Sequence, residues 1–271
     1  MPELPEVETT RRGIEPHITG KKVREVNIRD ARLRWPVPKD LRKQICDKKL
    51  LSVTRRGKYL LFNFQHGTML LHLGMSGSLR IDKPTTPCRK HDHVEIIFDK
   101  RTTLRLHDPR RFGSVHWTSD DPLQHPLLKN LGPEPLSRDF NADYLFSQSR
   151  KRKVAIKLFI MNSHVVVGVG NIYANEALFL AGIHPKRLAG NISRERYALL
   201  VSAIKKVLRR SIKQGGTTLR DFLNSDGQPG YFKQQLHVYD RKGEPCKQCG
   251  TPIKQFVQGQ RSTFYCAHCQ T

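Results

Sequence analysis

The chain has 271 residues, enough for about two domains with a sizeable hydrophobic core. It carries 48 lysines and arginines against 24 aspartates and glutamates, and the resulting formal charge of +24 indicates a polyanionic partner, most simply nucleic acid. The apolar runs are too short to span a bilayer, the acidic N-terminus has no signal-peptide core, and six cysteines are too few for a disulfide scaffold. We therefore expect a soluble cytoplasmic protein without a membrane partner.

The N-terminus combines a predicted short helix over residues 3–14 with a candidate nucleophile. Once the initiator methionine is removed, Pro2 has a free secondary amine, and because an α-amino group titrates near ~8, a useful fraction is uncharged at neutral pH. Such an amine can attack a sugar carbon that is losing its base, and the iminium cation then acts as an electron sink for elimination. General acid chemistry would use one of the nearby carboxylates Glu3, Glu6 and Glu8. Alternatively, proline and acidic residues here simply suit the first turn of a helix.

The next part of the chain changes to a period of two, which is typical of β-strands. The predicted strands are residues 23–28, 50–55, 58–64, 68–81, 94–98, 103–106 and 114–117. Short strands at this spacing, separated by glycine-containing turns, indicate an antiparallel sandwich or barrel. The proline-rich stretch at residues 121–135 marks the boundary to a second half.

The second half has helical periodicity over residues 143–160 and 193–214, and Gly215 ends the latter helix. Between them, a glycine-bearing connection over residues 165–170 leads into a helix with a predicted N-cap at Asn171, where backbone N–H groups would bind a phosphate. The same pattern also fits a helix-turn-helix that serves packing alone. The basic run at residues 150–153 adds phosphate-binding charge or is a solvated face, and residues 217–230 are predicted as an exposed loop.

A zinc site is the strongest single prediction at the C-terminus. Two Cys-x2-Cys pairs, separated by sixteen residues, provide four thiolates for a closed tetrahedral site, and the ligands are Cys246, Cys249, Cys266 and Cys269. A closed site leaves no position for a substrate, so this zinc should be structural. Redox cysteines or a chance arrangement are the alternatives. Residues 253–257 and 262–265 alternate as a hairpin, and Arg261 in it is a phosphate contact or plain surface charge.

Two loops of the β half place apolar side chains beside an arginine. Met75 lies in a glycine-flanked segment, and Arg110 and Phe112 lie in a turn that begins with a proline. DNA-kinking proteins insert apolar wedges of this kind into a base stack. Taken separately, Met75 and Phe112 would as readily be core residues.

Together these motifs resemble the formamidopyrimidine-DNA glycosylase family of bacterial base-excision repair over the whole chain. The matching segments are residues 2–8 (PELPEVE), 57–60 (GKYL), 72–77 (HLGMSG), 90–93 (KHDH), 108–113 (DPRRFG), 168–173 (GVGNIY), 225–227 (SDG) and the four-cysteine finger with Gln260 and Arg261. Leu4 also fits, since the sister family, endonuclease VIII, typically has glycine there.

The resemblance implies an α+β fold: an N-terminal β-sandwich, a C-terminal helical domain with a helix-two-turn-helix, and a zinc-finger β-hairpin. The implied domains are residues 1–130 (catalytic), 131–230 (helical, with the lesion loop) and 231–271 (zinc finger). The implied activity is that of a bifunctional glycosylase and AP lyase. It would excise 8-oxoguanine and formamidopyrimidines from double-stranded DNA through a Pro2 Schiff base, followed by β,δ-elimination. We expect a monomer with one structural Zn²⁺ in the bacterial cytoplasm, associated with the nucleoid through DNA.

Residue roles are carried over from the same resemblance. The implied catalytic residues are Pro2 (nucleophile), Glu3 (acid and base at the sugar), Lys58 (β-elimination) and Arg261 (δ-elimination). The implied DNA-binding residues are Met75, His91, Arg110, Phe112, Lys151 and Asn171. Arg110 would face the orphaned cytosine, which is chemically apt because a guanidinium has only donors and cytosine offers acceptors on its pairing edge. Residues 217–230 resemble the lid over the flipped purine.

Two alternatives remain open at this point. An endonuclease VIII-like enzyme would prefer oxidised pyrimidines, but Leu4 and the long loop at residues 217–230 argue against it. A zinc-dependent DNA-binding protein without catalysis is the other, and the intact residues Pro2, Glu3, Lys58 and Arg261 argue against that. An incision assay on an oligonucleotide that contains 8-oxoguanine separates all three.

Overall fold

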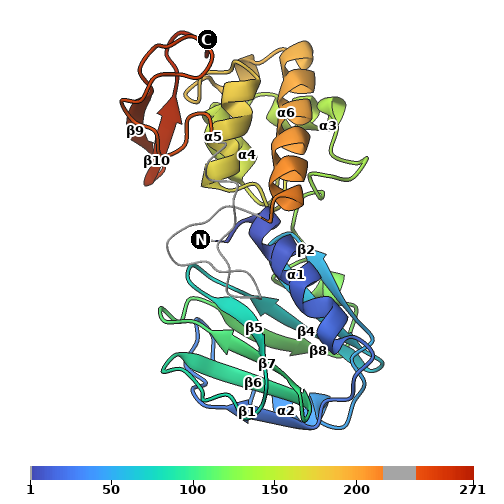
Figure 1. Ribbon diagram of the computed structural model, residues 1–271. Helices are drawn as coiled ribbons and strands as arrows, with labels where there is room; N and C mark the ends of the chain where they lie inside the picture. Colours follow the sequence, from blue (N-terminus) through green and yellow to red (C-terminus); the bar gives the residue numbers. More distant parts are fainter. Residues whose placement is uncertain (1, 216–235) are drawn as a thin grey trace. The chain divides into compact units, whose positions relative to one another are not determined.

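The chain is composed of two compact units, and each is described here by itself (Figure 1). The computed structural model describes residues 2–215 and 236–271. The first unit holds residues 2–129 with 214–215, and the second holds residues 130–213 and 236–271. The predicted lid at residues 217–230 lies outside the described residues, and the three-domain division stays a prediction. Within the described ranges, no helix has the length and apolar character needed to cross a membrane.

The first unit is an antiparallel β-sandwich. One four-stranded sheet has the order β2 (Ser52–Arg56), β3 (Tyr59–Phe64), β4 (Gly67–His72) and β8 (Ser114–Thr118). The other has the order β1 (Glu25–Ile28), β6 (Asp92–Asp99), β7 (Thr102–His107) and β5 (Ser78–Asp82). These sheets confirm the sandwich that the alternating pattern predicts.

The core lies between the two sheets and is closely packed. On β7, Leu104 and Leu106 point into it while Thr103 and Arg105 alternate with them, as the period of two requires. The cavity left among the core side chains has a volume of only about 10 Å³ and an apolar lining. Such a space does not hold a ligand, so the candidate functional residues must act from loops, turns and chain ends.

The predicted strand over residues 68–81 is wrong, because the chain changes sheet within it. Strand β4 ends at His72 and β5 begins at Ser78, and these two strands belong to different sheets. Gly74 makes the change possible with a φ of +66°, a conformation that L side chains rarely adopt. The apolar alternation continues through the turn, which is why the pattern alone does not show the break.

Helix α1 (Leu4–Ile18) covers part of the sandwich and contacts β2, β3, β5 and β7. Its buried apolar face consists of Leu4, Val7, Ile14 and Ile18. The helix is one turn longer than predicted because Ile18 extends this face. Two short helical segments, α2 (Leu41–Ile45) and η1 (Pro122–Gln124), complete the described elements of the unit.

The second unit joins a set of helices to a C-terminal hairpin. The helices are α3 (Ala142–Ser149), α4 (Ile156–Met161), α5 (Asn171–Leu180), η2 (Ala189–Asn191) and α6 (Arg194–Lys213). The hairpin is β9 (Lys254–Gln258) and β10 (Arg261–Tyr265). Helix α5 contacts α4, α6 and β10, so the hairpin packs on the helical part of the same unit.

The predicted helix over residues 143–160 is also wrong, because it is two helices. Helix α3 ends at Ser149, and Lys151 has a φ of +62°. The backbone of the intervening residues bonds to another segment instead: Ala189 N–H donates to the Val154 carbonyl at 2.9 Å, and Ile156 N–H donates to the Arg187 carbonyl at 2.7 Å. These tertiary hydrogen bonds replace the helical ones.

A carboxylate network ties α1 to the sandwich. Glu8 accepts hydrogen bonds from Arg11 and Arg12 on its own helix, and from Arg55 Nε on β2 at 3.0 Å. Burial raises the pKa of Glu8, but the hydrogen bonds from the three arginines outweigh burial and lower it to about 2. The carboxylate therefore stays ionised at neutral pH.

We predict that Glu8→Gln makes the unfolding free energy depend less on pH in the acid range. The lowered pKa contributes stability that is present above the ordinary value of 4.5 and is lost as the pH falls toward about 2. Allowing for solvent screening of the arginines, the wild type should lose about 2 kcal/mol in this window. Urea unfolding followed by circular dichroism at several pH values measures it. Glu25→Gln, at an exposed position, is the control, and an equal flattening in both variants would contradict the prediction.

Candidate functional site

The N-terminal residues are held at the start of α1. Pro2 is buried, Glu3 is 2% exposed, and the Glu3 N–H donates to Glu6 Oε2 at 2.9 Å. Glu6 therefore caps the helix, and Glu8 is engaged by three arginines. Glu3 is part of the same capping box, and it stays the candidate general acid because it directly follows Pro2 in the chain.

Lys58 lies in a two-residue turn between β2 and β3, where Gly57 has a φ of +58°. Arg55 links this turn to the N-terminal helix: its Nε donates to Glu8, and its Nη1 donates to the Gly57 carbonyl at 2.8 Å. Through this contact the helix that begins beside Pro2 and the turn that carries Lys58 are tied together. The sequence gives no signal for the role of Arg55.

The structure brings Met75, Arg110 and Phe112 together on two adjoining loops. Met75 is half-buried and Arg110 is exposed, as is Phe112 with 43% of its surface accessible. The Arg110 guanidinium lies over the Phe112 ring at 4.9 Å from its centroid. An exposed arginine stacked on an exposed aromatic ring fits a wedge better than a core position.

His91 precedes β6 at the end of a loop that a buried ionic network anchors. Arg105 is fully buried; its Nε donates to Glu95 Oε1 at 2.8 Å and its Nη2 to the Thr86 carbonyl at 2.7 Å. Arg80 forms a bidentate pair with Asp92, at 3.1 and 2.7 Å. Partial burial, and then the nearby His107 and Lys90, hold the pKa of His91 below its usual range.

In the second unit, the helix that follows the predicted phosphate-binding turn has a different N-cap residue from the expected Asn171. Gly170 is the N-cap of α5, and Asn171 is the first helical residue. The Asn171 side chain instead donates to the Ser262 carbonyl at 3.0 Å, and the fully buried Lys157 donates to the same oxygen at 3.1 Å. These contacts place Asn171 beside Ser262, the residue that follows Arg261. Arg261 itself is exposed at the start of β10.

The basic run at residues 150–153 serves two purposes. Arg150 is structural: its guanidinium lies 3.9 Å from the Phe146 ring centroid and donates to the Ile192 carbonyl at 2.9 Å. Lys151, by contrast, is exposed. The expectation of phosphate-binding charge along the whole run is therefore wrong for Arg150, and Lys151 keeps its predicted role as a candidate contact.

The four predicted zinc ligands converge, with all four sulfur atoms within 4.8 Å of one another. The Sγ atoms of Cys249 and Cys269 are 3.4 Å apart, those of Cys249 and Cys266 are 3.5 Å apart, and those of Cys246 and Cys269 are 3.9 Å apart. A tetrahedron of thiolates around Zn²⁺ requires sulfur separations of about 3.8 Å, since Zn–S bonds are about 2.3 Å long. The N–H groups of Gln248 and Cys269 point at ligand sulfurs, which favours the thiolate form. The residues fit one structural zinc ion.

Glu176 connects α5 to the segment that leads into the zinc finger, and no sequence pattern selects it in advance. Its buried carboxylate accepts three backbone N–H groups, from His237 at 2.8 Å and from Val238 and Tyr239 at 2.9 Å each. Burial raises the pKa of Glu176, although the three hydrogen bonds oppose that shift. A small apolar cluster that includes Phe179 and Phe264 packs the finger on the same helix.

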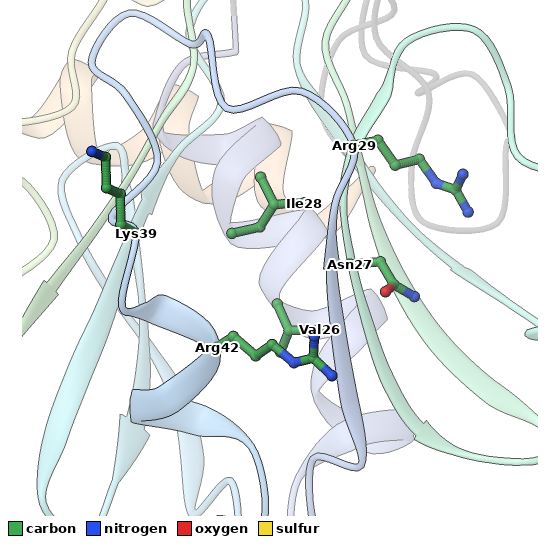
Figure 2. A pocket seen from close by; sticks show the side chains of 6 residues that line it. All are labelled: Val26, Asn27, Ile28, Arg29, Lys39 and Arg42. Atoms are coloured by element: carbon green, nitrogen blue, oxygen red, sulfur yellow. The ribbon is translucent and has the colours of Figure 1, made fainter.

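A separate cavity of about 540 Å³ lies beside β1 in the first unit (Figure 2). Its lining residues are Val26, Asn27, Ile28, Arg29, Lys39 and Arg42. Figure 2 shows Asn27 and Arg29 pointing away from Lys39 and Arg42, and both are directed to Glu95, at 3.1 Å for Asn27 and 3.6 Å for Arg29. Because its cations do not converge on one point, we assign no anion site to this cavity.

Comparisons with known protein families match most of the chain. Residues 1–115 match the formamidopyrimidine-DNA glycosylase N-terminal domain, and residues 131–223 match the formamidopyrimidine-DNA glycosylase H2TH domain. Residues 243–271 match a zinc finger found in FPG and IleRS.

Individual relatives match over the full length. Two proteins named formamidopyrimidine-DNA glycosylase, from Thioalkalivibrio sulfidiphilus and Methylococcus capsulatus, are 61% and 60% identical over 270 residues, which is 100% of each chain. The MutM (FPG) protein from Thermus thermophilus is 38% identical, with a TM-score of 0.89 over 99% of this chain and 98% of that one. A mutant of the Lactococcus lactis FPG in complex with Fapy-dG-containing DNA is 33% identical, with a TM-score of 0.93 over 100% of both chains.

For the zinc ion, we predict that Cys249→Ser loses the metal and, with it, DNA binding. A closed structural site contributes directly to folding, so removing one thiolate should unfold the finger. Metal analysis of the purified protein should find one zinc per chain in the wild type and far less in the variant, and a mobility-shift assay measures DNA binding. Cys88→Ser, outside the cluster, should keep both. Full DNA binding by a metal-free protein would refute the prediction.

The α+β fold, the converging cysteines, the three family matches and the full-length relatives all agree. A sequence identity of 61% over the whole chain indicates membership of the same family and not only a shared fold. The chain belongs to the formamidopyrimidine-DNA glycosylase family.

Proposed function

We propose that this protein excises oxidised purines, such as 8-oxoguanine and formamidopyrimidines, from double-stranded DNA in base-excision repair and then cleaves the strand at the abasic site. The observation that carries the proposal is the full-length identity of 61% to a protein named for this activity. Solved relatives support it further, since similar chains are bound to Fapy-dG DNA and to carbocyclic 8-oxo-G DNA. The charge of +24 suits a polyanionic substrate.

In the proposed first step, the Pro2 amine attacks C1′ of the damaged nucleotide while the bond from C1′ to the base breaks. The amine proton leaves with the base, and the nitrogen lone pair then breaks the bond from C1′ to O4′, so that the sugar ring opens, O4′ takes a proton and an iminium ion forms. Glu3 is the proposed acid and base at the sugar. The positive end of the α1 dipole lies just after Pro2 and opposes protonation of its amine, which favours the nucleophilic form.

The proposed second and third steps break the strand. The iminium acidifies C2′, and removal of its proton expels the 3′ phosphate by β-elimination, for which Lys58 is the proposed proton-handling group. A further elimination expels the 5′ phosphate with assistance from Arg261. Exposure of Arg261 and its place beside Asn171 support a contact with a phosphate. The resident zinc supplies only structure, because its four thiolates fill its coordination sphere.

We further propose that the protein acts as a monomer at the bacterial nucleoid, since its substrate is chromosomal DNA. His91, Lys151 and Asn171 are proposed to contact phosphates around the lesion. A damaged base pair lowers the cost of flipping the nucleotide, and the proposed wedge would fill the space it leaves.

The covalent step can be tested with borohydride, which reduces the iminium to a stable enzyme–DNA adduct. We predict that the wild type gives such an adduct on DNA that contains 8-oxoguanine, and that Pro2→Gly or a variant that retains the initiator methionine gives far less. Gel electrophoresis under denaturing conditions measures the adduct. The control is Pro16→Ala, which changes an exposed proline at the other end of the same helix and should trap normally. An undiminished adduct in the Pro2 variant would rule out this nucleophile.

The phosphate contacts can be tested through salt dependence. We predict that Lys151→Ala lowers the slope of log affinity against log salt by about 0.9, the effect of one neutralised phosphate. Fluorescence anisotropy with a labelled duplex measures the slope. Lys39→Ala, at the separate cavity, removes the same charge and should leave the slope nearly unchanged. Equal changes in both variants would mean that Lys151 acts only through the net charge.

A further inference from the structure

One buried carboxylate joins the two loops that carry Met75, Arg110 and Phe112. Asp108 is fully buried at the end of β7, before the loop that leads to β8. Its Oδ1 accepts a hydrogen bond from the Ser76 hydroxyl at 2.9 Å, and its Oδ2 accepts one from the Gly113 N–H at 2.7 Å. A single side chain thus holds both ends of its own loop and the loop between β4 and β5.

Ser76 continues the link to the arginine of the wedge. Its hydroxyl donates to Asp108 and accepts a hydrogen bond from the Arg110 N–H at 3.3 Å. The two loops are also in backbone contact: a Cβ on Gly74 would lie 2.3 Å from the carbonyl carbon of Phe112, so only glycine fits there. Met75 and Phe112 therefore project from backbones that touch.

Two further contacts fix the outer ends of these loops. The Gly74 N–H donates to Nδ1 of His72 at 3.0 Å. Burial, and then the charges of Lys58 and Arg34, lower the pKa of His72 to about 4, so the ring is neutral and Nδ1 keeps its lone pair at pH 7. On the other loop, Arg111 has a φ of +57° and pairs with Asp30 at 2.7 Å.

From these contacts we propose that Asp108 and Ser76 are positioning residues that hold Met75, Arg110 and Phe112 as one preassembled wedge for insertion into the base stack. The inference rests on the proposed function, because insertion matters only if a base is flipped. Three side chains that are already ordered before binding lose less conformational entropy on entering DNA than three that become ordered only on binding. Neither Asp108 nor Ser76 needs to contact DNA for this role.

Ser76→Ala is the variant that separates this role from folding. It removes the bridging hydroxyl but leaves Asp108 bonded to the Gly113 N–H, and the loop lies outside the sandwich core. Thr103→Val is the matched control, since it also deletes a buried hydroxyl of this unit, one that bonds the Ile96 carbonyl at 3.2 Å within the sheet. Ser76→Thr restores a hydroxyl and serves as the rescue.

The experiment uses a duplex with 8-oxoguanine opposite cytosine and 2-aminopurine beside the lesion, whose fluorescence rises when the stack opens. We expect Ser76→Ala to slow both this signal and single-turnover excision by at least about tenfold, as the loss of a charge-assisted hydrogen bond implies, while Ser76→Thr recovers most of both. Borohydride trapping at a preformed abasic site in single-stranded DNA needs no wedge and should stay within about twofold of the wild type. Both Ser76→Ala and Thr103→Val should be folded at the assay temperature, although the lost charge-assisted hydrogen bond should lower the melting temperature of Ser76→Ala further.

Three results would overturn the proposal: an unchanged insertion signal in Ser76→Ala, an equal slowing in Thr103→Val, or a parallel loss of trapping at the abasic site. The first would show that the wedge needs no such link, and the other two would show a general defect of the fold. Failure of the proposed function is distinguishable, because the wild type itself would then not excise 8-oxoguanine. In that case, insertion into a duplex with an abasic site still tests the wedge by the same fluorescence signal.

Discussion

A carboxylate that leaves water must be hydrogen-bonded, and this constraint organises the segments that carry the candidate site residues. Glu8 accepts from Arg55 and so joins the N-terminal helix to the turn of Lys58. Asp108 joins the two loops of the wedge, and Glu176 collects three N–H groups at the entry to the zinc finger. Each is a single side chain whose loss would leave several donors without an acceptor, so each segment is fixed relative to the unit that carries it.

The same logic applies to a group of buried charges on one face of the sandwich. Apolar side chains line the interior between the sheets, and the cavity among them has a volume of only about 10 Å³. The outer face of the second sheet carries Arg80, Asp92, Glu95 and Arg105, and the loop before His91 covers them. These side chains form ion pairs with one another, and Arg105 also donates a hydrogen bond to the Thr86 carbonyl of the loop. A segment that holds a candidate DNA contact is therefore anchored by charge, while the core is stabilised by apolar packing.

Elements with one unbroken periodicity could be predicted from the sequence, and elements that depend on distant partners could not. Helix α6 and the strands of the sandwich follow their apolar patterns closely. The stretch over residues 68–81 is one alternating run, but it divides where Gly74 meets the backbone of Phe112. The helix predicted over residues 143–160 divides where residues 154–156 bond to residues 187–189. In both cases the deciding contact comes from a segment more than thirty positions away along the chain, which no local pattern reports.

For the site, the sequence by itself determined the chemistry that is on offer: the Pro2–Glu3 start, the four cysteines with metal-ligand spacing, the basic surplus and the residues of the two loops. These depend on residue type and short spacing, which the primary structure contains in full. Only the tertiary structure decided which of the neighbouring groups are structural. It assigned Glu8 to a contact with Arg55 on β2, and Arg150 to a contact with the Ile192 carbonyl. The reason is physical: whether a polar side chain serves structure or substrate depends on the partner that folding brings to it.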